Sequence, residues 1–197
     1  MKPEEYVFAK LALDSSKVIA FPTETVMGLG VYFDDFIAYQ NLNAIKNRPE
    51  DKPYTMMVAD RDDIEKYAFI DDRAKKIIHS LMPGEVTLLL KAKNNVPSYV
   101  THGTGIIGIR IPNLDDLRGF LRAIGRPLLV PSANKSGEKP AMSSSEVKKI
   151  FTDELGYVFD GEANSGRPST IIDLSGDEVK IIREGNVSLE TVLNIIK

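Results

Sequence analysis

The sequence predicts one α/β domain, residues 1–197, in which helices pack on a sheet of mixed strand direction. Short runs rich in β-forming residues alternate with amphipathic helical stretches along the chain. Several late strand candidates follow one another closely, which indicates that strands of both directions share the sheet. The 197 residues suffice for one well-packed domain and are short for two, and they contain no repeat, low-complexity tract or long linker.

The first half of the chain alternates helices and strands. We predict a helix over residues 4–15, a strand over 17–21, a helix over 35–46 and a strand over 54–59. A further helix is predicted over residues 71–81, because its apolar positions fall on one face. Met82-Pro83-Gly84 ends this helix, since proline cannot continue a helix and glycine supplies the turn.

The second half is predicted to be richer in strands. The strand candidates are residues 86–91, 106–111, 128–130, 157–159, 170–174 and 179–182. Helices are predicted over residues 114–124, 144–151 and 188–196. The last two strands are separated by a short turn, which supports the expectation of mixed strand directions.

Composition excludes several classes of protein. The 43% apolar and 27% charged residues are typical of a globular protein, and no apolar run approaches the roughly 20 residues of a membrane helix. Residues 1–5 turn acidic at once and lack the apolar core of a signal peptide, so we expect a cytoplasmic protein with no membrane partner. The absence of cysteine excludes disulfides, thiolate nucleophiles and cysteine-bound zinc.

The net charge of −3 argues against a protein that grips nucleic acid over a wide positive face. It leaves room for a local basic cleft that binds a small polyanion. Residues 103–108 match G-x-G-x-x-G, but they precede a predicted strand instead of opening a helix, so we do not expect a dinucleotide loop. His79 and His102 match no metal spacing, and Ser132 lacks the G-x-S-x-G setting of a hydrolase.

Two polar segments in the first half are candidates for binding. Residues 21–30 follow a strand and combine two threonines, a glutamate and glycines, which suits either a binding loop or an ordinary βα turn. Residues 46–53 carry the cations Lys46, Arg48 and Lys52, which could neutralise a triphosphate. On charge alone we favour the other interpretation, in which cations at a helix end interact with the helix dipole.

Two later segments add further candidates. Ser132 and Asn134 follow the apolar strand 128–130, and their alternation would point a hydroxyl and an amide the same way. This segment could equally be a solvated turn. The last segment joins residues 166–173 with residues 182–185. Arg110 lies between two isoleucines on a predicted strand, where it could be an outward charge or could point into a cleft and bind a carboxylate.

Taken together and in this order, these segments resemble the YrdC-like threonylcarbamoyl-AMP synthase family in its short, single-domain form. The most specific pieces are Lys-x-Arg at Lys46 and Arg48, and Ser-x-Asn at Ser132 and Asn134. Supporting pieces lie at residues 21–25, 83–88, 110–112 and 169–170, and the resemblance runs from about residue 17 to residue 185.

The resemblance implies a twisted mixed sheet with a concave basic cleft. It implies an enzyme, an L-threonylcarbamoyladenylate synthase, that joins L-threonine to bicarbonate, activates the carbamate on ATP and releases pyrophosphate. Mg²⁺ would be held mainly by the ATP phosphates, with no metal site in the protein. A downstream threonylcarbamoyl transferase complex would move the group to an adenosine of tRNA, and a weak contact between this chain and tRNA is also expected.

The resemblance also assigns roles to individual residues. Those implied to contact ATP are Arg48, Lys52, Asn134 and Arg183. Those implied to hold threonine or its carbamate are Thr25, Arg110, Ser132 and Ser169. The implied catalytic set is Lys46, which would lie close to the phosphates, with Arg48, Ser132 and Asn134. No protein nucleophile is needed, because the carbamate oxygen attacks the α-phosphate directly and the protein supplies positioning and charge.

Three methionines depart from the family pattern. Met27 stands where the family often has tyrosine, Met57 where it has histidine, and Met142 where a threonine is common. Methionine is only a weak acceptor and cannot replace a hydrogen-bond donor. These departures keep two alternatives open. One is a non-catalytic RNA-binding paralogue that uses the same basic cleft, and the other is a carbamoyl-adenylate enzyme that does not use threonine.

Overall fold

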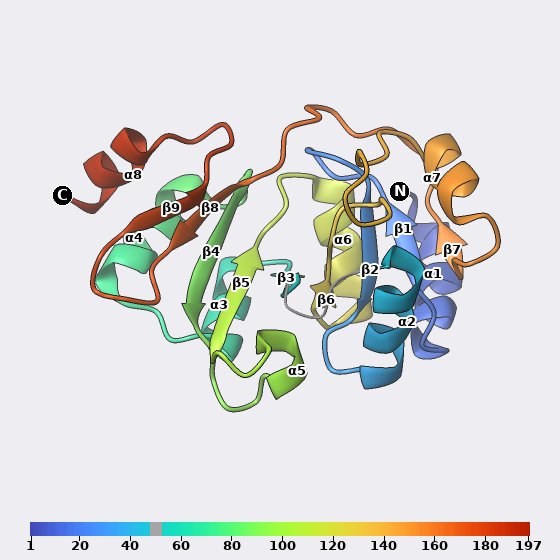
Figure 1. Cartoon of the computed structure of the whole chain (residues 1–197), viewed down its shortest axis with the longest axis horizontal. Coiled ribbons are helices and arrows are strands. Elements are labelled where there is room, and N and C mark those ends of the chain that lie inside the picture. Colours follow the sequence, from blue (N-terminus) through green and yellow to red (C-terminus); the bar gives the residue numbers. More distant parts are fainter. Residues whose placement is uncertain (48–52) are drawn as a thin grey trace.

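The computed structural model describes residues 1–47 and 53–197, and the strands in this part of the chain form one mixed nine-stranded sheet (Figure 1). The strands are β1 (Ile19–Phe21), β2 (Gly28–Tyr32), β3 (Thr55–Met57), β4 (Val86–Lys91), β5 (Ile106–Arg110), β6 (Leu128–Leu129), β7 (Tyr157–Val158), β8 (Thr170–Asp173) and β9 (Lys180–Arg183). Their order across the sheet is β7-β1-β2-β6-β3-β5-β4-β8-β9. The pairs β1/β7, β3/β5 and β4/β8 are parallel and the other pairs antiparallel, which confirms the predicted mixed α/β fold.

Helices flank both halves of this sheet. They are η1 (Pro3–Glu5), α1 (Tyr6–Asp14), α2 (Phe36–Lys46), α3 (Arg61–Tyr67), α4 (Asp72–Leu81), α5 (Ser98–Thr101), α6 (Asp115–Ile124), α7 (Ser144–Phe151) and α8 (Leu189–Ile196). Figure 1 shows α1, α2, α6 and α7 around the half that contains β1 and β2, and α3, α4 and α8 around the half that contains β4, β8 and β9. Across the two described stretches, every helix is too short or too polar to span a bilayer.

Local sequence signals set the ends of the helix that leads to the predicted phosphate-binding segment. The Asp35 carboxylate caps α2 by accepting a hydrogen bond from the Ala38 backbone N–H at 3.0 Å. The helix ends at Lys46 because Asn47 adopts the left-handed conformation, with φ of 49°. Lys46 therefore sits in the last turn of α2, immediately before the segment that returns to β3.

Residues of β1 alternate between two apolar clusters on opposite faces of the sheet. Ala20 packs with the cluster that includes Leu29, whereas Ile19 and Phe21 pack with the residues of α1 and α6. This alternation follows from the two-residue period of a strand. The helices and the sheet thus enclose apolar layers on both faces, and polar side chains gather where several strands end.

The strand β2 and the helix α3 were not predicted from the sequence. β2 has a weak sequence signal because two of its residues are glycines. Gly30 is needed there, since a Cβ would lie 2.6 Å from Cε1 of Phe21, whose buried ring packs over the strand. The short α3 buries only Ile64 and so lacks an apolar stripe. Its start is marked instead by a capping box between Asp60 and Asp63, a signal that could have revealed it.

Candidate active site

A cavity of about 490 Å³ opens where the ends of several strands meet. Its walls come from the β1–β2 connection, from β3, β4 and β5, from the segment after β6, and from the residues around β8 and β9. Its polar lining includes Thr23, Thr25, Thr55, Thr87, Arg110, Ser132, Asn134, Ser169 and Arg183. These hydroxyls, amides and guanidiniums suit a polar or anionic ligand.

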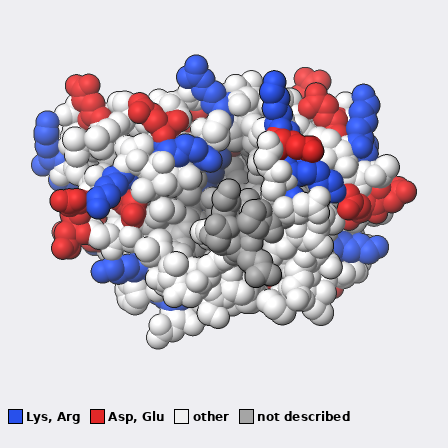
Figure 2. Space-filling view, viewed as in Figure 1, with Lys and Arg blue, Asp and Glu red and all other residues white. Residues whose placement is uncertain are grey.

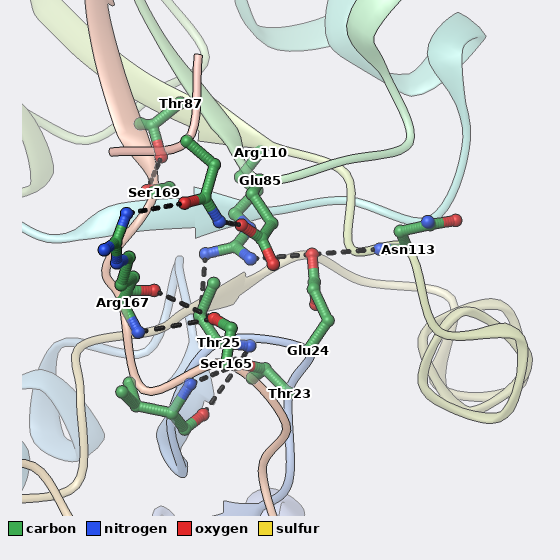
Figure 3. Close-up of polar contacts among 12 residues, drawn as sticks. Thr23, Glu24, Thr25, Glu85, Thr87, Arg110, Asn113, Ser165, Arg167 and Ser169 are labelled. Carbon is green, nitrogen blue, oxygen red and sulfur yellow. Dashed lines mark hydrogen bonds and ion pairs between the residues drawn. The ribbon is translucent and has the colours of Figure 1, made fainter. Parts of the chain in front are cut away.

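Arg110, at the end of β5, points into this cavity and not outward to solvent. Its Nη2 donates to Oε1 of Glu24 at 2.6 Å, and its Nη1 donates to the Thr25 hydroxyl at 3.3 Å (Figure 3). Oε1 of Glu24 also accepts from the backbone N–H of Asn113 at 3.1 Å. Both residues are 7% exposed, so this is a buried ion pair at the side of the cavity that Arg110 lines.

The β1–β2 connection owes its shape to Thr23. The Thr23 hydroxyl donates to the carbonyl of Val26 at 2.7 Å and accepts from the backbone N–H of Thr25 at 3.1 Å. It also lies 2.9 Å from the Thr25 hydroxyl. Because β1 and β2 are antiparallel neighbours, the alternative of an ordinary βα turn is wrong for this segment. The connection presents Thr25 to the cavity beside Arg110.

The segment after β6 brings Ser132 and Asn134 together as expected. The Ser132 hydroxyl donates to Oδ1 of Asn134 at 2.6 Å, and Nδ2 of Asn134 donates to the carbonyls of Lys135 and Glu138. Lys46 lies behind this segment and is 1% exposed. Its ammonium donates to the carbonyls of Ser132 at 2.6 Å and Asn134 at 2.7 Å. Lys46 therefore holds the wall of the cavity from the side of α2.

Ser169, just before β8, connects the opposite wall. Its hydroxyl lies 2.9 Å from that of Thr87 on β4, and its carbonyl accepts from Nε and Nη2 of Arg183 at 3.0 and 2.9 Å. Desolvation of the guanidinium and the positive charge of Arg110 both lower the pKa of Arg183. The two arginines are thus close enough to repel each other across the cavity.

The structure brings six of the predicted site residues into the lining of one cavity: Thr25, Arg110, Ser132, Asn134, Ser169 and Arg183. Arg48 and Lys52 lie outside the described residues. Sequence reasoning assigned no role to Glu24 or Thr87, although both lie in segments that carry the family resemblance. The signal for Glu24 was a carboxylate between two threonines directly after a buried strand.

Two of the three departing methionines contribute apolar wall. Met27 and Met57 line the cavity and are buried, at 0% and 2% exposure. Met142 is not among the described lining residues, and its backbone N–H donates to the Glu146 carboxylate at 2.7 Å. In this chain Met27 and Met57 therefore place apolar, polarizable side chains in the cavity wall.

Charges of both signs surround the face shown in Figure 2, on either side of its central hollow. Among the described residues that line the cavity, the charged ones are Arg110, Arg183 and Glu138. Whether the whole cleft is basic therefore stays a prediction. Within residues 1–47 and 53–197, no three His, Cys, Asp or Glu residues gather in a way that could hold a metal ion.

The fold and the cavity define an α/β protein with a polar cavity, lined by two arginines, where several strands end. The chain belongs to the Sua5/YciO/YrdC family, because the family model, described as "Telomere recombination", matches residues 11–185. A protein of Sodalis glossinidius named threonylcarbamoyl-AMP synthase is 36% identical over 183 residues, which cover 89% of this chain and 93% of that protein.

Solved structures of Sua5 and YciO share this fold. The Pyrococcus abyssi Sua5 complexed with L-threonine superposes with a TM-score of 0.94 at 30% identity and covers 100% of this chain. This chain spans only 58% of the length of that protein. The Escherichia coli YciO structure has a TM-score of 0.89 at 25% identity, and the match covers 97% of this chain and 94% of that one. The predicted family is confirmed.

Proposed function

We propose that this chain is a threonylcarbamoyl-AMP synthase, which makes threonylcarbamoyl-adenylate and pyrophosphate from L-threonine, bicarbonate and ATP. The observation that carries the proposal is the single cavity in which Arg110 and Arg183 stand beside the hydroxyls of Thr25, Ser132 and Ser169. Threonine and ATP both carry negative groups, and cations on more than one wall would hold the two together. The names of the relatives and the threonine bound to the similar Sua5 support the same activity.

Each wall suits one part of the reaction. Arg110 is the group for the threonine carboxylate, because a guanidinium binds a carboxylate through parallel hydrogen bonds. The hydroxyls of Thr25 and Ser169 lie beside it and fix the orientation of the amino acid. We assign Asn134 and Arg183, together with Arg48 and Lys52, to ATP, and Ser132 to threonine or its carbamate. Lys46 supports the ATP wall through its hydrogen bonds to the carbonyls of residues 132 and 134.

The chemistry is a displacement at phosphorus. Threonine and bicarbonate first form the carbamate with loss of water. A carbamate oxygen then bonds to the α-phosphorus of ATP, and the bond from that phosphorus to the bridging oxygen breaks, which releases pyrophosphate. The protein positions the reactants and stabilises the developing charge. ATP would enter with Mg²⁺ held mainly by its phosphates.

The reactivity of the product indicates which partner this chain would need. A mixed anhydride of a carbamate and AMP hydrolyses readily, so a downstream threonylcarbamoyl transferase complex that acts on tRNA adenosine would take it up. We place this reaction in the cytoplasm and include a weak contact with tRNA in the proposal.

RNA binding without catalysis is the competing function. Among the described lining residues Tyr54 is the only aromatic one, and a single ring offers little surface for base stacking.

Pyrophosphate release from MgATP tests the proposal, measured with threonine and bicarbonate together and with each omitted. Release that needs both substrates and falls at least tenfold in Arg183→Ala supports a synthase that uses this cavity. Arg122→Ala is the matched control, because Arg122 pairs with Asp60 and is not among the residues that line this cavity. Salt-sensitive RNA binding without any substrate-dependent release would replace the synthase by an RNA-binding protein.

A further inference from the structure

Only one of the two carboxylate oxygens of the buried Glu24 makes hydrogen bonds to the described residues. Oε1 accepts both the Nη2–H of Arg110 and the backbone N–H of Asn113. Oε2 is buried and has no hydrogen-bond partner among the described residues, and the same holds for Nε of Arg110. Buried polar atoms normally find partners, so a pair that leaves two of them unused needs a physical reason.

The form of the ion pair supplies part of that reason. Glu24 contacts Arg110 through one nitrogen, where a full fork would use two parallel hydrogen bonds. Asn113 and Arg110 together fix Oε1, and Thr25 fixes the Nη1 side of the guanidinium. Nε of Arg110 is buried, so the groups left for a second carboxylate in the cavity are the other N–H groups on Nη1 and Nη2.

The charge balance supplies the rest. Arg110 and Arg183 line the same cavity, and the Arg110 charge contributes to the lowered pKa of Arg183. Glu24 neutralises the charge of Arg110, with which it forms an ion pair, so the uncompensated positive charge of this group stays with Arg183 on the ATP side. The neutral Glu24–Arg110 pair suits an amino acid, whose carboxylate is balanced by its own ammonium, whereas a phosphate dianion would bring uncompensated charge into a poorly solvated place.

We propose that Glu24 is a positioning residue that selects a monoanionic carboxylate. It holds Arg110 by one edge, so that the guanidinium offers its free N–H groups to the amino-acid carboxylate. It also reduces the local charge, so that this end of the cavity takes a carboxylate and rejects phosphate groups. The two substrates are thereby sorted to their own walls. The identity of the carboxylate as that of threonine rests on the proposed function.

The test is calorimetric titration of threonine into wild type, Glu24→Gln and Glu24→Asp, with and without inorganic phosphate. We expect Glu24→Gln to weaken threonine binding at least about tenfold and to make phosphate compete with threonine, because a second uncompensated cation attracts a dianion. Wild type should bind threonine with the same affinity at every phosphate concentration. Glu24→Asp keeps the charge but shortens the side chain, so threonine binding should weaken while phosphate stays excluded.

Asp34→Asn is the matched control, because Asp34 also pairs with an arginine, Arg126, and lies outside the described cavity lining. Unchanged threonine affinity and no phosphate competition in Glu24→Gln would overturn the inference. If Glu24→Gln does not fold, equal threonine binding by Glu24→Asp and wild type would overturn it. A wild type that binds no threonine at all would instead remove the proposed function, and phosphate binding by Glu24→Gln would still report on the charge balance.

Discussion

The substitution Lys46→Met removes a buried ammonium that anchors the wall carrying Ser132 and Asn134. This ammonium is 1% exposed and donates to the carbonyls of Ser132 and Asn134 at 2.6 and 2.7 Å. Methionine fills a similar volume but donates no hydrogen bond. Two buried carbonyls would therefore lose a charged donor.

The expected cost follows from these two contacts. A hydrogen bond to a charged group contributes about 1.5–3 kcal/mol, and relief from burying the ammonium offsets part of the loss. We expect the free energy of unfolding to fall by about 3 kcal/mol, which lowers Tm by about 6–12 °C for a domain of this size. Urea titration followed by circular dichroism measures the first quantity, and a thermal melt measures the second.

The same substitution should reduce pyrophosphate release at least tenfold, because the Ser132 hydroxyl and the Asn134 amide lose their support. Lys10→Met serves as the control, since Lys10 makes an exposed helical pair with Asp14 that contributes at most about 0.5 kcal/mol. The reasoning is refuted if Lys46→Met unfolds within about 0.5 kcal/mol of wild type and keeps its activity.

Three further substitutions test other parts of the structure. Arg110→Lys keeps the charge but loses the planar fork, so the KM for threonine should rise about 10–100-fold in steady-state assays. Gly30→Ala would press a Cβ against the buried Phe21 ring and should cost about 1–3 kcal/mol in urea titrations. A hydrogen bond from Arg122 lowers the pKa of Asp60, so ionised Asp60 stabilises the fold above its unfolded pKa of about 3.9, and this stability is lost as pH falls through the folded pKa. Asp60→Asn should therefore flatten the acid limb of Tm against pH.

Controls accompany each of these substitutions. Gly176→Ala should leave stability unchanged, because no atom lies within 4 Å of the added Cβ. Asparagine at position 60 retains an acceptor for the start of α3, so its effect reports on charge. A KM that does not move in Arg110→Lys would exclude a carboxylate fork, and parallel Tm profiles for Asp60→Asn and wild type would exclude the proposed pH dependence.

Sequence periodicity predicts the elements whose burial is one-sided and local. The helix α4 buries Ala74, Ile77 and Ile78 on one face, and this spacing is visible in the sequence. The strand β2 is missed by this periodicity, because its two glycines carry no side chain and the ring that covers them belongs to β1. A strand packed by its neighbour's side chain has no signature of its own.

The contacts in the candidate site also differ in how far they could be predicted, because some join residues close in the sequence and others join distant ones. Ser132 and Asn134 are two residues apart, so their proximity could be predicted, but β6 ends at Leu129 and strand alternation is not what joins them. Arg110 meets Glu24 from 86 positions away, and only the pairing of the sheet decides that it points inward. The anchoring of residues 132–134 by Lys46 spans a similar separation and could not be predicted from the sequence.

The last third of the chain occupies both ends of the sheet order. β7 pairs with β1 near one end and β8 pairs with β4 towards the other, so the segment between them crosses the molecule, as Figure 1 shows along the top. Ser169 ends that crossing, and Arg183 follows on β9. During synthesis the ribosome therefore releases the cavity's final wall only after the other walls have emerged. The contacts between this wall and the others join residues far apart in the sequence, the kind of contact that forms late in folding.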